Sequence, residues 1–171
     1  SALNVPPPEE LASSRDVPAD VLAKLPEKMR RFLEIERPFE LRPVQKVDYL
    51  NPTEQQPVQQ MWLKTIGKLP DDDVLHRCLL AYVSDYNLLN TAVLPHKTSW
   101  VTGNLMMASI DHAMWFHRSF RVDDWLLYSM DSPSASGARG FARGSIFTRD
   151  GKLVASTAQE GVIRVMEARP E

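Results

Sequence analysis

The segment DDDVLHRCLLAYVSDYNLLNTAVLPH, residues 71–96, decides how the rest of this chain is expected to fold. Its apolar residues recur three or four positions apart, which is the spacing of one face of an α-helix. Further leucines and valines extend this face until apolar groups nearly surround the segment, and such a helix is buried. Three aspartates open the segment, where acidic residues favour a helix N-terminus, and Pro95 marks its end. We therefore expect one long buried helix that the remaining chain covers.

The composition is that of a single ordinary domain. Of 171 residues, 43% are hydrophobic and 25% are charged, which is enough for a sizeable core. A net charge of −2 gives no general affinity for nucleic acids, and no apolar run is long enough for a membrane span. Cys78 is the only cysteine, so we expect no intrachain disulfide, an inert thiol on the apolar helix face and a cytoplasmic location.

The sequence on both sides of this helix predicts a proline-rich arm and a set of strands. Nine of the thirteen prolines lie in residues 1–57, and residues 18–35 can form one amphipathic helix or two short ones broken at Pro26. An Asp-Gly pair at residues 150–151 predicts a hairpin turn. Strands are expected at 39–47, 58–65, 105–118, 124–131, 136–148 and 153–165.

Two strands, one buried helix and four strands follow each other in this order. A curved antiparallel sheet wrapped around the helix is the economical way to bury it. We therefore predict an α+β protein of the hotdog fold. Residues 1–36 are expected to be a linker and short helical arm, and residues 37–171 the hotdog domain.

The last predicted strand places an amide in the interior. Alternate residues of a strand share a face, and the more apolar face of residues 153–165 contains Gln159. A buried amide needs hydrogen-bond partners. Asp85, in the middle of the predicted helix, is the natural candidate, because a buried carboxylate is costly without compensation. A purely structural bond between helix and sheet is the alternative.

The strand over residues 105–118 contributes a third polar group. Its alternation of apolar and polar residues is weak, so either Ser109 or Asp111 could point toward the helix. The pattern alone leaves this choice open.

Three blocks of sequence carry a resemblance to a known family: SIDHAMWFHRSF, DDWLLYSMDSPSASGARGFARGSIFTRDGKLVASTAQEGVIR and LLAYVSDYNLL. They resemble the C-terminal half of acyl-CoA thioesterase II, the TesB-like family, from about Arg37 to Arg164. Family members carry two fused hotdog units, so the resemblance implies a fragment without its N-terminal hotdog. The implied partner is another hotdog domain, either the missing half or a second copy.

The resemblance also implies an activity and its residues. The family hydrolyses fatty acyl-CoA to free fatty acid and CoA without a covalent intermediate, and neither a metal nor a cofactor is expected. The catalytic residues fall on Asp85 in YVSDYN, Ser109 in ASIDH and Gln159 in TAQEG, although many members carry Thr at the position of Ser109. Asp85 would act as general base on a water that Ser109 and Gln159 hold.

Other side chains allow further hypotheses. Arg139 and Arg143 are spaced to contact CoA phosphates, or are solvated strand charges. Ser109, Asp111 and His112 include the residue types of a hydrolase triad, but neighbouring strand residues point to opposite faces and there is no G-x-S-x-G motif. A hotdog dehydratase based on Asp111 and His112, and a non-catalytic acyl-CoA-binding or structural hotdog module, stay open as alternatives.

Overall fold

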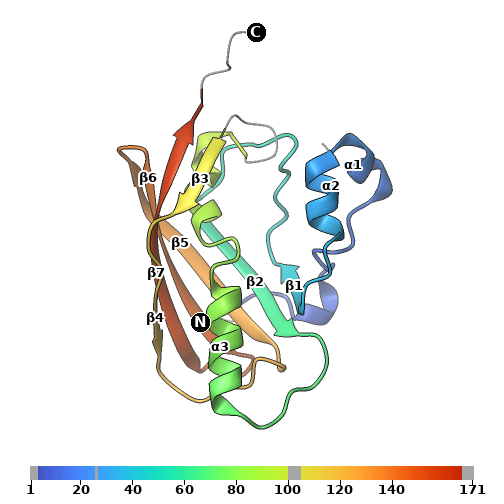
Figure 1. Ribbon diagram of the computed structural model, residues 1–171, viewed down its shortest axis with the longest axis vertical. Coiled ribbons are helices and arrows are strands. Elements are labelled where there is room, and N and C mark those ends of the chain that lie inside the picture. The colour runs from blue at the N-terminus through green and yellow to red at the C-terminus, as the bar shows by residue number, and fades with distance from the viewer. Residues whose placement is uncertain (1–3, 26, 100–104, 167–171) are drawn as a thin grey trace.

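A computed structural model describes residues 4–25, 27–99 and 105–166 (Figure 1). Within them, a curved antiparallel sheet of seven strands lies behind one helix, as the hotdog prediction requires. The strand order is β1-β2-β5-β6-β7-β3, and β4 also pairs with β7. The elements are η1 (Pro8–Glu10), α1 (Ala19–Lys24), α2 (Glu27–Glu34), β1 (Phe39–Pro43), β2 (Val58–Thr65), α3 (Asp73–Ser84), η2 (Leu89–Ala92), η3 (Leu94–His96), β3 (Leu105–Ser109), β4 (Ala113–Phe116), β5 (Leu126–Ser136), β6 (Arg139–Thr148) and β7 (Leu153–Val165).

The central helix α3 begins as predicted but ends earlier. The Asp72 carboxylate accepts hydrogen bonds from the backbone N–H groups of Val74 and Leu75, at 2.9 and 3.1 Å, and so caps the first turn. The helix stops at Ser84, and Asn87 adopts a left-handed φ of 62°. Asparagine tolerates this conformation, which ends helices. The single helix expected over residues 71–96 is therefore wrong, because its second half forms the short turns η2 and η3.

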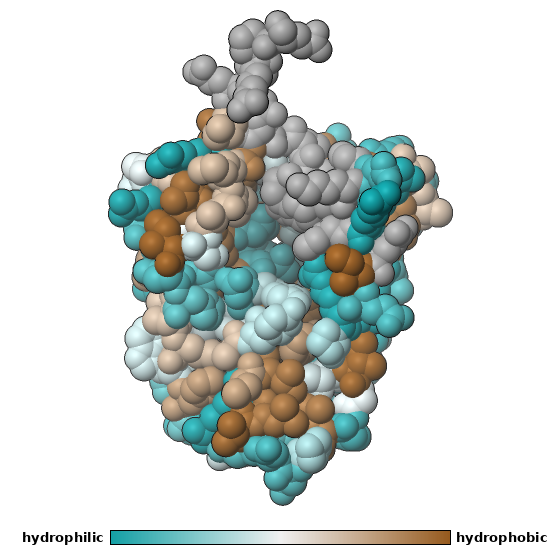
Figure 2. Space-filling model, viewed as in Figure 1, coloured by the Kyte–Doolittle hydropathy of each residue, from teal (hydrophilic) through white to brown (hydrophobic). Residues whose placement is uncertain are grey.

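The helix is also less buried than expected. Leu80 and Val83 are fully enclosed, whereas Val74 and Tyr82 are 68% and 58% exposed and Cys78 is exposed as well. The predictions of a helix buried on all sides and of a buried Cys78 thiol are wrong, because one curved sheet covers only one side of a helix. Figure 2 shows apolar side chains gathered on the uncovered side, over α3.

We call this uncovered side the open face. It comprises the exposed residues Val74, Cys78, Tyr82 and Asp85 of α3, which lie on one side of the helix at spacings of three and four. Phe116 of β4 borders it, with its ring 5.8 Å from the Arg77 guanidinium on α3.

Most of the predicted strands are confirmed. β2 and β7 have the predicted bounds, and residues 18–35 form the two short helices α1 and α2. The Asp-Gly turn is present, with Gly151 at a φ of 88° and the Thr148 N–H donating to the Lys152 carbonyl at 2.9 Å. β1 ends at Pro43 rather than at 47, and the strand expected over 105–118 is divided into β3 and β4.

The proline-rich arm packs against the convex side of the sheet, away from α3. The Trp62 indole N–H donates to the Pro6 carbonyl at 2.9 Å, and Arg42 donates to the Pro8 carbonyl at 2.7 Å. Arg149 forms two hydrogen bonds with the Glu9 carboxylate. Trp62 is consequently only 3% exposed.

Glycines let the chain beyond α3 approach the sheet closely. A Cβ on Gly140 of β6 would lie 2.7 Å from the Cβ of Ala92, and one on Gly161 of β7 would lie 2.7 Å from Leu89. Any larger residue would push η2 away from these strands. This close contact places η2, the segment that follows α3, against β6 and β7.

Candidate active site

The edge of the sheet carries a β-bulge between β3 and β4. Ser109 pairs with Gly161 and Ala113 pairs with Ala158, so three residues, 110–112, lie opposite two. The Asp111 carboxylate accepts from the Glu160 N–H at 2.7 Å and closes the bulge. One extra residue inverts the alternation of side chains. Ser109 and His112 therefore face the same side of the sheet, which a regular strand would not allow.

Gln159 is the centre of a hydrogen-bonded cluster beside this bulge. Its side chain has no exposed surface, and its Nε2 donates to the Ser109 Oγ at 2.6 Å. Its Oε1 lies 2.6 Å from the His112 Nδ1, and the His112 Nε2 lies 2.8 Å from the Ser84 Oγ on α3. The prediction that Gln159 points inward is confirmed. Its partners are Ser109 and His112 rather than the expected Asp85.

A second set of bonds anchors the helix end of this cluster. The buried Tyr128 hydroxyl donates to the Ser84 carbonyl at 2.8 Å and lies 2.8 Å from the Thr157 Oγ1. Burial raises the pKa of the Tyr128 hydroxyl above its usual range, while the Thr157 bond lowers it and the negative charge of Asp85 raises it.

Asp85 follows Ser84 directly and forms the C-cap of α3. Its side chain is exposed, and among the described residues no hydrogen bond or ion pair to its carboxylate is formed. The expectation of a buried carboxylate in mid-helix is wrong, because α3 ends here and Asp85 lies on the open face. The structure thus brings Ser109 and Gln159 into contact and places Asp85 one residue from Ser84, without a direct bond to either.

Sequence reasoning did not give His112 a place in this cluster. On a regular strand His112 and Ser109 point to opposite faces, and only the bulge brings both beside Gln159. The weak alternation of residues 105–118 was the only sign of this irregularity in the sequence.

The family model described as acyl-CoA thioesterase matches residues 29–162. The chain belongs to this family. It is 40% identical over 164 residues to acyl-CoA thioesterase 2 of Haemophilus influenzae, an alignment that covers 96% of this chain and 57% of the relative. The resemblance found in the sequence is therefore confirmed.

Solved structures agree with this family assignment. The crystal structure of the acyl-CoA thioesterase II TesB2 from Mycobacterium marinum superposes with a TM-score of 0.64 at 39% identity, covering 91% of this chain and 57% of that one. A hotdog protein from Alicyclobacillus acidocaldarius, at 15% identity and a TM-score of 0.64, supports the fold alone; it is covered over 54% of its length and this chain over 95%. The chain spans a little over half the length of these relatives.

The two arginines that were predicted to bind CoA phosphates lie on the opposite face of the sheet from the Gln159 side chain. Gly140 and Ala142 of β6 face the interior, so Arg139 and Arg143 are exposed on the opposite face of the sheet. Arg143 pairs with Asp131 at 2.5 Å, and Arg139 lies 3.6 Å from Glu160.

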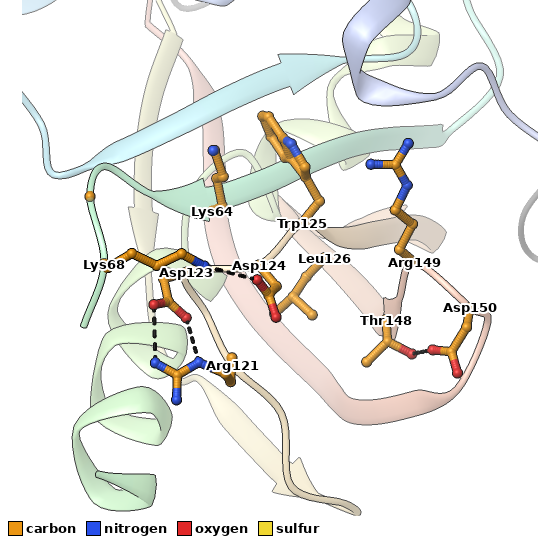
Figure 3. Close-up of a pocket in the computed structure, with 11 residues that line it drawn as sticks. Lys64, Lys68, Arg121, Asp123, Asp124, Trp125, Leu126, Thr148, Arg149 and Asp150 are labelled. Atoms are coloured by element: carbon orange, nitrogen blue, oxygen red, sulfur yellow. Dashed lines mark hydrogen bonds and ion pairs between the residues drawn. The ribbon is translucent and has the colours of Figure 1, made fainter. Parts of the chain in front are cut away.

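A cleft of about 610 Å³ is lined by other residues than those of the Gln159 cluster (Figure 3). Two pairs of opposite charges line it: Lys68 lies 3.4 Å from Asp124, and Arg121 donates to Asp123 at 3.0 Å. The Arg121 guanidinium holds the pKa of the Asp123 carboxyl below its usual range, against the opposing effect of burial. Asp123 also accepts from the Leu69 N–H at 2.9 Å, so this pair ties the loop before α3 to the loop before β5.

Two further findings concern the described part of the chain. It contains no group of three or more His, Cys, Asp or Glu residues placed to hold a metal ion. None of its helices combines the length and the apolar character that crossing a membrane requires.

Proposed function

We propose that this chain carries the hydrolytic site of an acyl-CoA thioesterase that converts fatty acyl-CoA to free fatty acid and CoA. One observation carries the proposal: in a member of this family, the buried Gln159 amide donates to the exposed Ser109 hydroxyl. This pair lies beside the end of α3, where Asp85 follows Ser84.

The proposed reaction uses a water as nucleophile. Ser109 and Gln159 orient the water, and Asp85 removes its proton as the water oxygen attacks the thioester carbonyl. The tetrahedral intermediate then collapses, the C–S bond breaks and CoA leaves as the thiolate, which takes up a proton. Ser109 is exposed and can reach water and substrate, whereas Gln159 supports it from the interior.

A second hotdog domain is the partner we propose for the open face. An exposed carboxylate is a poorly positioned base, but a domain packed on Val74 and Tyr82 would also enclose Asp85. Enclosure strengthens the electrostatic interactions of a carboxylate with its neighbours and with a bound water. That this chain spans little more than half of its relatives supports such pairing.

The contact of Arg139 and Arg143 with CoA phosphates stays a prediction. It requires the nucleotide to reach the convex face and to compete with Glu160 and Asp131. An acyl-pantetheine substrate, which lacks the nucleotide, tests it. If the contact exists, replacing either arginine raises KM for acyl-CoA but not for acyl-pantetheine.

The bond of Asp111 within the bulge favours hydrolysis over the dehydratase alternative. Its carboxylate accepts the Glu160 N–H, and both nitrogens of His112 contact other side chains. These two residues are therefore engaged in the fold. A cytoplasmic location and a role in fatty-acid metabolism accompany the proposal as predictions.

Release of free thiol from a panel of acyl-CoA esters of varied chain length tests the proposed activity. The panel is applied to this chain and to any longer protein that contains it. Thiol release that depends on acyl length supports a thioesterase. Saturable binding without release would instead indicate a binding module, and hydration of an enoyl-CoA would indicate the dehydratase.

A further inference from the structure

We infer that His112 is a positioning residue that holds the Gln159 amide in the orientation its contact with Ser109 requires. This inference rests on the proposed hydrolytic function of the same cluster. His112 bridges α3 and β7: its Nε2 lies 2.8 Å from the Ser84 Oγ, and its Nδ1 lies 2.6 Å from the Gln159 Oε1.

The bridge to Ser84 bears on the tautomer of the His112 ring. The Ser84 hydroxyl has a single hydrogen, and its oxygen lies 2.8 Å from the His112 Nε2 and 2.8 Å from the Ala81 carbonyl oxygen. A hydrogen directed at the Nε2 leaves the ring hydrogen on the Nδ1. Ser84 is fully buried, and the Tyr128 hydroxyl holds its backbone carbonyl in place.

The other ring nitrogen then determines how the amide lies. With its hydrogen on the Nδ1, the ring donates to the Gln159 carbonyl, and the amide N–H donates to Ser109, as in the structure. The Ser109 hydrogen is then free to bond a water or a carboxylate. A ring with an unprotonated Nδ1 would instead require the amide to turn by 180°, so that Ser109 donates to Gln159. In both arrangements it is His112 that selects the orientation of the amide.

A direct catalytic role does not fit the same contacts. Both nitrogens of His112 are engaged, one by Ser84 and one by Gln159, so no nitrogen is left to accept a proton from substrate or water. His112 acts through Gln159, and losing it should lower kcat rather than weaken substrate binding.

A matched pair of substitutions tests this role. In His112→Asn the amide nitrogen takes the place of the Nδ1 and keeps the bond to Gln159, whereas in His112→Gln the longer side chain reaches toward Ser84. We expect His112→Asn to retain kcat within about threefold, and His112→Gln and His112→Ala to lower kcat about tenfold at unchanged KM. His117→Ala is the control and should leave kcat unchanged, because among the described residues the His117 ring bonds only Ser156, on the other face of β7 from Gln159.

A measurement independent of activity accompanies the kinetics. The side-chain amide signals of Gln159, assigned by their loss in Gln159→Glu, should exchange with solvent slowly in the original chain and in His112→Asn. They should exchange at least about tenfold faster in His112→Gln and His112→Ala, since one hydrogen bond is lost.

The outcomes distinguish the positioning role of His112 from the proposed thioesterase function. Slow exchange that depends on His112, in a chain without thioesterase activity, would support the positioning role and count against the proposed function. The positioning role is overturned if His112→Gln and His112→Ala keep both kcat and slow exchange. It is also overturned if His112→Asn and His112→Gln lower kcat equally.

Discussion

The Gln159 Nε2 donates to the Ser109 Oγ over 2.6 Å, from a buried residue of β7 to an exposed residue at the end of β3. The donor belongs to a strand of thirteen residues that pairs with β6, β3 and β4. A site supported by such a central strand is positioned more precisely than one on a loop.

Asp85→Asn should lower kcat for acyl-CoA hydrolysis at least about 10²-fold, because the amide cannot act as general base. The free energy of unfolding should change by less than about 0.5 kcal/mol, since the exposed carboxylate bonds no described residue. Thiol release and urea unfolding measure the two effects. Asp73→Asn, on the same helix, is the control, and a turnover of Asp85→Asn close to the original would remove Asp85 from the mechanism.

Gln159→Leu should impair both activity and stability. It leaves the Ser109 hydroxyl and a His112 nitrogen without their partner, at a cost of about 1–3 kcal/mol in the free energy of unfolding. We expect kcat to fall at least about tenfold at the same time. Gln56→Leu, at an exposed position, should change neither quantity. Unchanged hydrolysis by a folded Gln159→Leu protein would argue against the proposed water-binding role.

Gly144→Ala should destabilise the fold at the bonds that anchor the helix end of the cluster. Its Cβ would lie 2.5 Å from the Thr157 Oγ1 and would collide with the Tyr128 ring, both of which are buried. Overpacking of this kind costs about 1–3 kcal/mol, measured as a lower urea midpoint. Ser145→Ala, on the next residue, serves as the comparison. Equal midpoints for the two variants would mean that the sheet yields more easily than the structure indicates.

Asp123→Asn should lower the free energy of unfolding at neutral pH. It should also make this free energy less sensitive to pH in the acidic range. The bonds from Arg121 keep the pKa of Asp123 in the folded protein below its ordinary value. The carboxylate therefore contributes stability above roughly pH 4, which is lost as the pH falls below its unfolded-state pKa. We expect a loss of about 1.5–3 kcal/mol at pH 7, and a smaller difference from the original chain below pH 4.

Urea unfolding at several pH values measures this difference. Asp124→Asn is the matched control, because Asp124 pairs with Lys68 at the surface, where such pairs contribute about 0–1 kcal/mol. A constant difference between Asp123→Asn and the original chain across this pH range would contradict the prediction.

The open face should make this chain self-associate. Light scattering at about 10 μM should give a mass above that of the 19.4 kDa monomer. Val74→Glu should shift the mass toward the monomer, and an acidic residue suits the first turn of α3. Ile35→Glu replaces another exposed apolar residue, outside the open face, and should have no such effect. A monodisperse monomer of the original chain would contradict the role assigned to this face.

Predictions that depend on near neighbours in the chain were mostly confirmed. Asp72 caps α3, the Asp-Gly turn precedes β7, and Gln159 faces inward. Each of these features depends on a pattern that spans only a few consecutive residues. Errors arose where a residue's environment depends on distant segments. Cys78 and Asp85 were expected to be buried, yet the sheet leaves their side of the helix uncovered.

The amino-acid sequence by itself determined the family, the hotdog architecture and the inward position of Gln159, because motif spacing and side-chain periodicity are local properties. Only the tertiary structure decided that His112 joins Ser109 at Gln159, and that Asp85 lies on an open face. The position of His112 depends on the extra residue between β3 and β4, opposite β7. The exposure of Asp85 depends on how far one curved sheet reaches around α3. Both are relations between segments far apart in the chain.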